Sequence, residues 1–371
     1  MVEDQNRQKN KDGKVDYILI GTVLLLLVIG LIAIYDVTIV AALRDFNDKF
    51  YYFKNQLIWA CLGMIAMSFF SFFDYHRLVK IGPLAMVISF FLLIGVLIPH
   101  VGTRVYGASR WFNLGPLRFQ PSEFAKLALI FYEVAIISKF EKYKIFLADA
   151  ALVIFLPAVL ITGLILLQPD LGTALLFVAI TLVMYFASNA PITHFIVSLP
   201  ILVLGAIAAV IIQPYRLSRF KAFMDPTIDP KGSSYQINQI LIALSSGGLL
   251  GVGLGASRSK FAFIPEVQSD AIFAIIVEEI GFVGALIIIS IFILLITRAL
   301  KVAQNASDLQ GRLLAVGIVS LIAIQSLFNI ASNVALVPLT GIPLPFISYG
   351  GSSLFMTMAS IGILNNIAKQ S

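Results

Sequence analysis

The sequence contains few charged residues. Only 12% of its 371 residues are Asp, Glu, Lys or Arg, whereas soluble domains carry about 25%. Apolar residues make up 59% of the chain, and the mean hydropathy is +0.94. A water-facing surface of ordinary size cannot be built from this composition, which excludes a soluble globular protein.

Residues that bind metals through sulfur or imidazole are also scarce. Cys61 is the single cysteine and lies in an apolar run, which excludes a disulfide framework and a cysteine-based metal site; we expect it to be a small buried residue. The histidines His76, His100 and His194 are scattered, so no tight metal site is indicated. The net charge of +6 comes without a block of like charge, and we therefore expect no nucleic-acid partner. No organic cofactor is expected either.

Long apolar runs are abundant. A bilayer core requires about 20 apolar residues per helix, and ten runs of roughly this length predict an all-α integral membrane protein with about ten transmembrane helices. The first run is too long for a signal-peptide core and no A-x-A cleavage site follows it, so it reads as an uncleaved anchor. The runs cover residues 17–36, 55–73, 79–99, 121–138, 147–167, 170–188, 193–213, 270–297, 311–333 and 350–368.

The distribution of Lys and Arg predicts the orientation, because cytoplasmic loops are enriched in both. Residues 1–16 become a cytoplasmic tail, 17–368 a single ten-helix membrane domain and 369–371 a cytoplasmic end, so both termini are cytoplasmic. The long loop between the seventh and eighth helices, 214–269, is then extracytoplasmic. The cations placed inside are Arg7, Lys9, Lys11, Lys14, Arg77, Lys80, Lys139, Lys142, Lys144, Arg298, Lys301 and Arg312.

Two loops that this orientation places outside, 100–120 and 214–269, also hold many cations. Salt bridges and anionic headgroups would explain them, and so would an anionic ligand at the outer face. Both readings stay open. The cations concerned are Arg104, Arg110, Arg118, Arg216, Arg219, Lys221, Lys231, Arg258 and Lys260.

The first of these loops leads directly into the fourth apolar run. Trp111 beside Arg110 suits an interfacial aromatic anchor as well as a binding site. Pro121 suits the first turn of a helix, which puts Glu123 and Lys126 one turn apart on the same face. They predict either an ion pair or a polar site that faces a substrate.

The second loop, 214–269, is too long to be a plain connection, since loops beyond about 15 residues are usually functional or disordered. It is too rich in apolar residues for disorder. Arg216 and Arg219 are spaced to share a helical face. The glycine-rich stretch at 245–255 can aim backbone N–H groups at phosphates, or it can form a tight re-entrant packing element.

Three acids, Asp270, Glu278 and Glu279, enter the eighth apolar run. A charge near the bilayer centre costs at least about 2.5 kcal/mol, so each needs a partner, a cavity or a raised pKa. Asp270 lies at the outer mouth, where an Asp is commonly a helix cap. At about 100° per residue, Asp270 and Glu278 would line one cavity and Glu279 would face elsewhere.

These residues together resemble the SEDS family (shape, elongation, division and sporulation), whose members include FtsW and RodA. The resemblance extends from about residue 17 to 368, and the stretch 301–318 looks more like FtsW than RodA. Each motif is weak alone, but the ordered set is specific. The motifs are Arg110-Trp111, Gln120-Pro121-Ser122-Glu123 with Lys126, Gln168-Pro169-Asp170, Arg216-Leu217-Ser218-Arg219, Tyr235-Gln236, Ser246-Gly247-Gly248, Pro265-Glu266 with Asp270, Glu278-Glu279, and 338–353 with Ser348.

The resemblance implies a peptidoglycan glycosyltransferase that polymerises lipid II at the outer face of the bacterial cytoplasmic membrane. It also implies a class B penicillin-binding protein as partner, besides membrane lipids and the glycan linked to undecaprenyl pyrophosphate. The family's essential aspartate falls on Asp270, and its functional basic residues fall on Arg110 and Arg118. Family members often have His-Thr before this aspartate, whereas this chain has Gln268-Ser269. The other expected substrate-binding residues are Trp111, Glu123, Lys126, Gln168, Asp170, Arg216, Arg219, Gln236, Glu278 and Ser348.

The chemistry of this reaction fits the residues. A carboxylate base assists attack by a sugar hydroxyl, and Asp270 is the candidate. The outer cations suit a pyrophosphate leaving group. A divalent ion, Mg²⁺ or Mn²⁺, would be held loosely by Asp270 and the substrate phosphates.

Two alternatives remain open: a lipid II flippase, which would need a polar path through the membrane, and a non-catalytic scaffold, which would not need Asp270.

Overall fold

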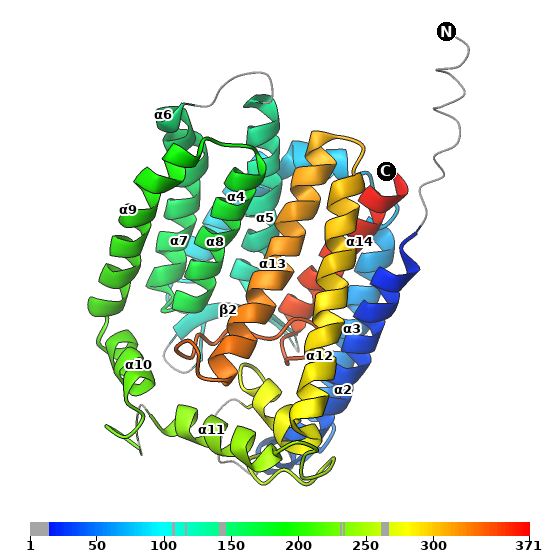
Figure 1. Cartoon of the computed structure of the whole chain (residues 1–371), viewed down its shortest axis with the longest axis vertical. Coiled ribbons are helices and arrows are strands. Elements are labelled where there is room, and N and C mark those ends of the chain that lie inside the picture. Colours follow the sequence, from blue (N-terminus) through cyan, green and yellow to red (C-terminus); the bar gives the residue numbers. More distant parts are fainter. Residues whose placement is uncertain are drawn as a thin grey trace.

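The computed structural model is a bundle of long helices, drawn in Figure 1. It describes residues 15–105, 108–115, 117–140, 146–230, 232, 234–260 and 267–371. The predicted tail, apart from its last two residues, and the Pro265-Glu266 motif lie outside these ranges, as do Lys142, Lys144 and Lys231. The bundle helices are α2 (Tyr17–Phe46), α3 (Tyr51–Phe70), α4 (Tyr75–Gly95), α5 (Pro121–Ile137), α6 (Leu147–Ala150) continued by η2 (Ala151–Phe155) and α7 (Leu156–Leu167), α8 (Leu171–Ala187), α9 (Ile192–Ile211), α12 (Ile272–Asn305), α13 (Leu309–Asn333) and α14 (Gly351–Lys369).

Each of the ten predicted runs coincides with a helix or helix group of this bundle. Within the described residues, seven segments are long and apolar enough to cross a membrane, and α8 is a shorter apolar helix. The remaining two runs correspond to α5, with 17 residues, and α14, with 19. Figure 1 shows the start of α2 and the end of α14 at the same end of the bundle, as an even number of crossings requires. The prediction of a multi-pass, ten-helix membrane protein is confirmed.

The two predicted outer loops contain regular structure that the apolar runs did not indicate. The loop 100–120 forms a small antiparallel sheet of β1 (Thr103–Val105), β2 (Ala108–Leu114) and β3 (Leu117–Phe119) in the order β1-β2-β3. Thr103 pairs with Trp111, and Phe112 pairs with Phe119. The loop 214–269 contains α10 (Pro214–Met224) and α11 (Tyr235–Gly247); the short helix η1 (Ser138–Phe140) follows α5. Figure 1 places β2, α10 and α11 at the end of the bundle opposite the start of α2. We call this the site end.

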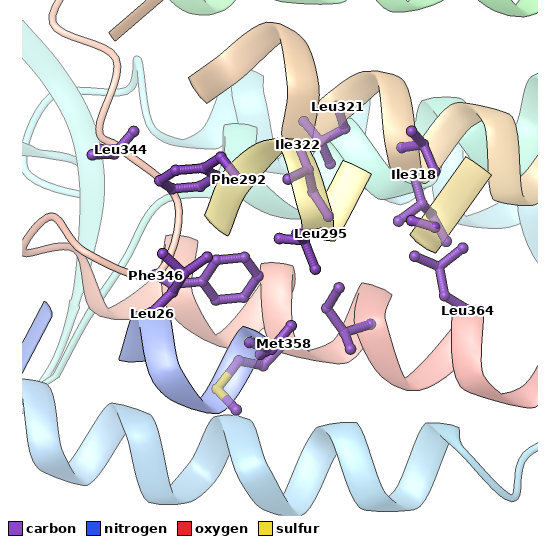
Figure 2. Packing of buried hydrophobic residues seen from close by; sticks show 14 of the residues in the cluster. Leu26, Phe292, Leu295, Ile318, Leu321, Ile322, Leu344, Phe346, Met358 and Leu364 are labelled. Atoms are coloured by element: carbon purple, nitrogen blue, oxygen red, sulfur yellow. The ribbon is translucent and has the colours of Figure 1, made fainter. Parts of the chain in front are cut away.

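The core lies where α12, α13 and α14 meet α2. Phe292 and Leu295 of α12, Ile318 and Ile322 of α13 and Met358 of α14 belong to one buried cluster, drawn in Figure 2. All five are at most 2% exposed. Helix α9, by contrast, has no buried residue, which suits a helix that faces lipid.

Close packing between neighbouring helices depends on glycine. A Cβ atom on Gly82 of α4 would lie 2.5 Å from the carbonyl oxygen of Phe131 in α5, so the two backbones approach too closely for any other residue. Small residues serve this purpose in membrane helix pairs. Cys61 is not the small buried residue that we expected. It lies exposed on α3, a helix whose apolar outer face suits contact with lipid.

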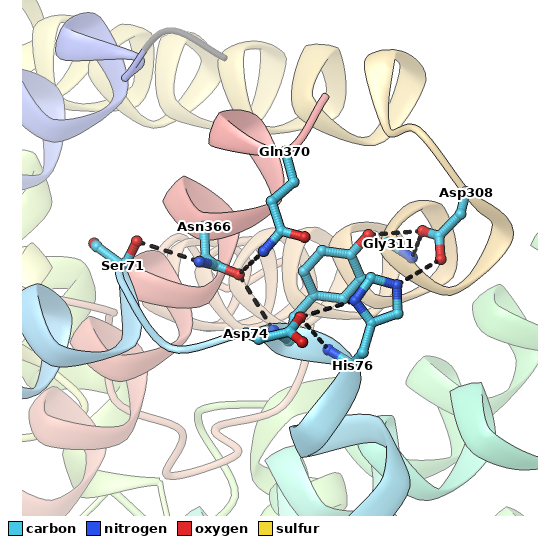
Figure 3. A network of polar contacts seen from close by, with 8 residues as sticks. Ser71, Asp74, His76, Asp308, Gly311, Asn366 and Gln370 are labelled. Atoms are coloured by element: carbon cyan, nitrogen blue, oxygen red, sulfur yellow. Dashed lines mark hydrogen bonds and ion pairs between the residues drawn. The ribbon is translucent and has the colours of Figure 1, made fainter. Parts of the chain in front are cut away.

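A polar network closes the end of the bundle opposite the site (Figure 3). The His76 ring lies between two carboxylates, with Nδ1 2.8 Å from Asp74 and Nε2 3.0 Å from Asp308. Asp308 also caps α13 by accepting from Gly311 N at 2.8 Å. Ionised carboxylates only accept hydrogen bonds, so a protonated imidazole can donate to both carboxylates at once. The network joins α4 to the α12–α13 turn.

Candidate functional site

Asp270 lies in the turn before α12 and is 8% exposed. Its carbonyl oxygen accepts hydrogen bonds from two amides of α13, Asn329 Nδ2 at 3.0 Å and Asn333 Nδ2 at 2.7 Å. Two bonds to one carbonyl fix the backbone, so the carboxylate projects from a rigid position.

The groups around the Asp270 carboxylate have opposing effects on its pKa. Burial raises its pKa above the ordinary value, while the charge of Arg219 and the hydrogen bonds from Ser269 and Gln236 act in the opposite direction. Burial disfavours the charged form and prevails. Ser269 Oγ donates to Oδ1 at 3.4 Å, and Gln236 belongs to α11. Elements far apart in the sequence therefore converge on one carboxylate.

The segment 339–342 connects Asp270 with a second predicted motif. Arg219 Nη1 donates to the Leu339 carbonyl at 3.5 Å. Gly341 has φ +71°, and a Cβ there would lie 4.0 Å from Asp270 Oδ2. The Thr340 carbonyl packs against Gly172, at the start of α8. A small pocket beside this segment is lined by Arg219, Ala222, Phe223, Gln236, Ile237 and Leu339.

The guanidinium group of Arg110 bonds to the Gln168-Pro169-Asp170 motif. Its Nε donates to the Gln168 carbonyl at 2.9 Å and its Nη2 to the Pro169 carbonyl, while Nη1 lies 3.6 Å from Asp170 Oδ2. Asp170 also caps α8 by accepting from Thr173 N at 3.1 Å. The buried Gln168 side chain donates to the Leu93 carbonyl at 3.1 Å. These groups are committed to internal hydrogen bonds.

Arg216 and Arg219 of α10 have different surroundings although their spacing is helical. Arg216 is 5% exposed and donates to the carbonyls of Ala209 and Leu166 at 2.9 and 2.8 Å. It therefore fastens α10 to the ends of α7 and α9. The Arg219 side chain is exposed and can meet a ligand.

Arg118 of β3 is exposed, and Trp111 of β2 is half-buried. Burial raises the pKa of Tyr349 to about 12, and the charge of Arg118 acts in the opposite direction, so Arg118 lies near Tyr349. Tyr349 N donates to the Gln268 carbonyl at 2.8 Å, two residues before Asp270. Arg118 is thus the second exposed cation close to this part of the chain.

Glu123 and Lys126 form a buried ion pair at 2.8 Å, the first of the two readings that their spacing allowed. Lys126 Nζ also donates to Gln325 Oε1 at 3.2 Å, and Gln325 Nε2 donates to the Pro343 carbonyl at 2.9 Å. Ser348 is buried and accepts from Leu344 N at 2.8 Å. These residues hold the 338–353 motif in shape beneath the site.

Glu278 does not line a cavity with Asp270 as its helical spacing predicted. It accepts from Ser257 Oγ at 2.5 Å and from Arg258 N at 3.3 Å. The prediction was wrong because Asp270 precedes the helix, which begins at Ile272, so helical angles do not relate the two residues. Glu279 instead pairs with Lys260 at 3.0 Å.

The glycine-rich stretch packs against a break in α12. Gly281 interrupts the helix with φ 71° and ψ −173°, and Phe282 N donates to the Gly248 carbonyl at 2.9 Å. In return, Val252 N and Gly253 N donate to the carbonyls of Glu278 and Glu279 at 3.0 Å. These bonds make the stretch a packing element against α12, the second of the two readings, and they occupy the N–H groups of Val252 and Gly253.

Two site residues were not predicted as such. Asn329 and Asn333 stand four residues apart on one face of an apolar helix, and polar residues at such depth are usually functional. Among the described residues, no group of three His, Cys, Asp or Glu side chains could hold a metal ion. A divalent ion at Asp270 would therefore need ligand oxygens from the substrate.

The fold and the site define a class: a polytopic membrane protein with a buried, rigidly held aspartate and exposed arginines at one end of its bundle. A model of the FtsW/RodA/SpoVE family, described as cell cycle protein, matches residues 16–371. The chain belongs to this family.

Similar proteins support this membership over nearly the whole chain. Stage V sporulation protein E of Bacillus subtilis is 44% identical over 96% of this chain and 97% of its own. A probable peptidoglycan glycosyltransferase FtsW of Trichlorobacter lovleyi is 38% identical over 95% and 93%. The predicted leaning towards FtsW over RodA agrees with the name of the second relative, whereas the first is named as a sporulation protein.

Solved structures share the fold. A chain from a study of the structural coordination of polymerization and crosslinking by a peptidoglycan synthase complex has a TM-score of 0.78 at 30% identity, covering 95% of this chain and 97% of that one. The rod shape determining protein RodA of Thermus thermophilus has a TM-score of 0.69 at 28% identity, covering 95% and 96%.

Proposed function

We propose that this chain is a peptidoglycan glycosyltransferase that polymerises lipid II at the outer face of the bacterial cytoplasmic membrane. The family, the relatives named as probable peptidoglycan glycosyltransferases and the likeness to a synthase complex support the coarse activity. The observation that carries the proposal is the buried Asp270 carboxylate, which lies close to Arg219 on a residue whose backbone carbonyl is held by two amides.

Asp270 acts as the general base in this proposal. The acceptor hydroxyl oxygen forms a bond to the donor's anomeric carbon, the bond from that carbon to the pyrophosphate oxygen breaks, and the hydroxyl proton passes to Asp270. A base is most effective when its pKa is near the working pH. Burial raises the pKa of Asp270 from the ordinary carboxyl value, which is the direction that base catalysis requires.

Arg118 and Arg219 are the best candidates to stabilise the leaving pyrophosphate, because their side chains are exposed. Arg110 and Arg216 instead donate to backbone carbonyls, and we assign them a structural role in positioning the elements of the site. Direct contact of substrate with Trp111, Gln168, Asp170, Gln236 or Ser348 remains a prediction. A divalent cation held by Asp270 and substrate phosphates would add positive charge where the leaving group develops its negative charge.

A class B penicillin-binding protein is the proposed partner, since a relative in structure comes from a complex that coordinates polymerization and crosslinking.

The flippase and scaffold hypotheses stay as alternatives. One feature favours a polar path: Glu133 of α5 is fully buried, and its Oε2 has no hydrogen-bond partner among the described residues. Its other oxygen accepts from Thr181 at 2.6 Å.

The decisive experiment compares wild type with Asp270→Asn in the presence of lipid II and the partner. Loss of general base catalysis typically costs about 10²–10⁴-fold in rate, so Asp270→Asn should make no detectable glycan polymer. Lipid II transport and co-purification of the partner are measured on the same variant. Wild-type polymer levels would refute the assignment of Asp270, and Glu133→Gln that abolishes transport without affecting polymer would favour the flippase.

A further inference from the structure

Residues 248–255, which directly follow α11, form an exposed apolar segment that we call the apolar tip. Leu249, Leu250 and Leu254 are 71%, 80% and 78% exposed. No Asp, Glu, Lys or Arg occurs between residues 232 and 257. Contiguous exposed apolar surface of this kind marks a membrane or protein interaction site.

The apolar tip is held rigidly. Phe282 N donates to the Gly248 carbonyl at 2.9 Å, and Val283 N donates to the Leu249 carbonyl at 3.2 Å. Val252 N and Gly253 N donate to α12 in return, so the backbone of the tip is fixed at both of its ends. This backbone holds the three leucine side chains on the outside of the protein.

Two ion-pair clusters on α2 and α12 indicate where the bilayer boundaries lie. Arg298 pairs with Asp16 at 2.7 Å, and Lys260 pairs with Asp36 at 2.8 Å and with Glu279 at 3.0 Å. From Asp16 to Asp36 the helical rise amounts to about 30 Å. This is about the thickness of the hydrocarbon core, so the Lys260 cluster marks its boundary at the site end.

The apolar tip joins α12 at this boundary. Val252 N and Gly253 N donate to the carbonyls of Glu278 and Glu279, next to the Lys260 cluster, and Leu249 accepts from Val283 N, just after the break at Gly281. The next residues of α12 are exposed and apolar, namely Phe282, Val283, Leu286 and Ile287. The apolar tip is therefore continuous with the lipid-facing surface of the bundle.

We propose that the apolar tip inserts into the bilayer leaflet at the site end and anchors the 214–269 region to the lipid acyl chains. The occupant of this surface is lipid. Insertion holds α11 against the membrane, and with it Gln236, which bonds to Asp270. The proposal stands independently of the reaction that the site performs.

The test uses full-length protein in lipid nanodiscs, with Cys61→Ser as background and single cysteines labelled with an environment-sensitive fluorophore. Leu250→Cys and Leu254→Cys are the test positions. Thr227→Cys, exposed before α11, is the aqueous control, and Leu286→Cys on the outer face of α12 is the lipid control. We expect both test positions to show the blue-shifted emission and the quenching by spin-labelled lipid seen at Leu286→Cys. Labelling by a membrane-impermeant maleimide should be about tenfold slower than at Thr227→Cys, as burial of a leucine-sized group implies.

Test positions that label and quench like Thr227→Cys would overturn the proposal. So would protection that appears only when the partner transpeptidase is added, because the occupant would then be protein. Each labelled variant must melt like the background protein. If one of them does not fold, Leu249→Cys takes its place on the same tip.

Discussion

At the scale of single residues, the burial of Asp270 predicts a conflict between activity and stability. The folded state raises the pKa of Asp270 by burial, so folding is favoured most when the carboxyl is protonated. The free energy of unfolding should therefore fall as the pH rises from the ordinary carboxyl pKa to the raised pKa of the folded state, and it should stay low at higher pH. Each unit by which the folded-state pKa is raised lowers this free energy by about 1.4 kcal/mol. Asn cannot ionise and avoids this cost.

Asp270→Asn should accordingly be inactive yet melt at a higher temperature than wild type at pH 7. The difference should vanish at acidic pH, where Asp270 is also neutral. Thermal unfolding of both proteins in the same detergent from pH 4 to pH 8 measures it. A lower melting temperature for the variant at pH 7 would show that the ionised carboxylate is stabilised in the fold, contrary to this account.

The arginines of α10 and β3 offer a second test at this scale, because their burial separates two roles. Arg118→Ala and Arg219→Ala should lower polymer yield while the melting temperature stays the same. Arg216→Ala should lower the melting temperature, since buried carbonyls that lose their donor cost about 1–3 kcal/mol each.

Lysine variants provide the matched controls. Arg118→Lys keeps the charge and should retain much of the activity. Arg216→Lys cannot reproduce the hydrogen bonds of a guanidinium and should remain destabilised. Equal melting temperatures for Arg216→Ala and wild type would contradict the fastening role of Arg216.

At the scale of elements, apolar runs predicted where helices occur but not where they end. The run 17–36 is part of α2, which continues to Phe46 through Arg44 and Asp45. Hydropathy marks only the part of a helix that lies in hydrocarbon, whereas backbone hydrogen bonding continues into polar sequence. The β1-β2-β3 sheet was missed for a related reason, since a search for long apolar runs passes over strands of three to seven residues.

The membership of the site stays a prediction, whereas its geometry comes from the structure. The motifs proposed Asp270 and the residues around it, but sequence does not distinguish a buried arginine such as Arg216 from an exposed one such as Arg219. Glu278 was misplaced because the helix was assumed to start at Asp270. Asn329 and Asn333 contact a backbone carbonyl, and such contacts leave no motif.

The break in α12 gives the prediction at this scale. A Cβ on Gly281 would collide with Gly251 N and the Leu249 carbonyl, and its φ of 71° is strained for an L-residue by about 1–3 kcal/mol. Gly281→Ala should therefore lower the melting temperature and free the 248–255 segment. Gly205→Ala on α9 is the control, because nothing lies within 4 Å of a Cβ there.

Limited proteolysis and thermal unfolding of the two glycine variants are the measurements. Ala is a better helix former than Gly by about 1 kcal/mol, so Gly205→Ala should be neutral or slightly stabilising. If Gly281→Ala behaved like Gly205→Ala, the packing of the glycine-rich stretch against the break could not be important for stability.

At the scale of the whole molecule, the proposed reaction requires a particular orientation in the membrane. Helices α10 and α11 lie at the end of the bundle opposite the start of α2 (Figure 1), and Gln236 of α11 bonds to Asp270. The proposed polymerisation of lipid II takes place outside the cytoplasmic membrane. The cation-rich ends of α12 and α13, with Arg298, Lys301 and Arg312, must then face the cytoplasm, as the distribution of Lys and Arg predicts.

In a Cys61→Ser background, Thr227→Cys should react with a membrane-impermeant maleimide added to intact cells, and Asn305→Cys should react only after the cells are permeabilised. Both residues are exposed, so a lack of reaction reports the side of the membrane and not burial. The opposite pattern would place Asp270 in the cytoplasm, beyond reach of the outer leaflet. The site could not then polymerise lipid II, however well its residues suit the chemistry, and the proposed function would fall with the topology.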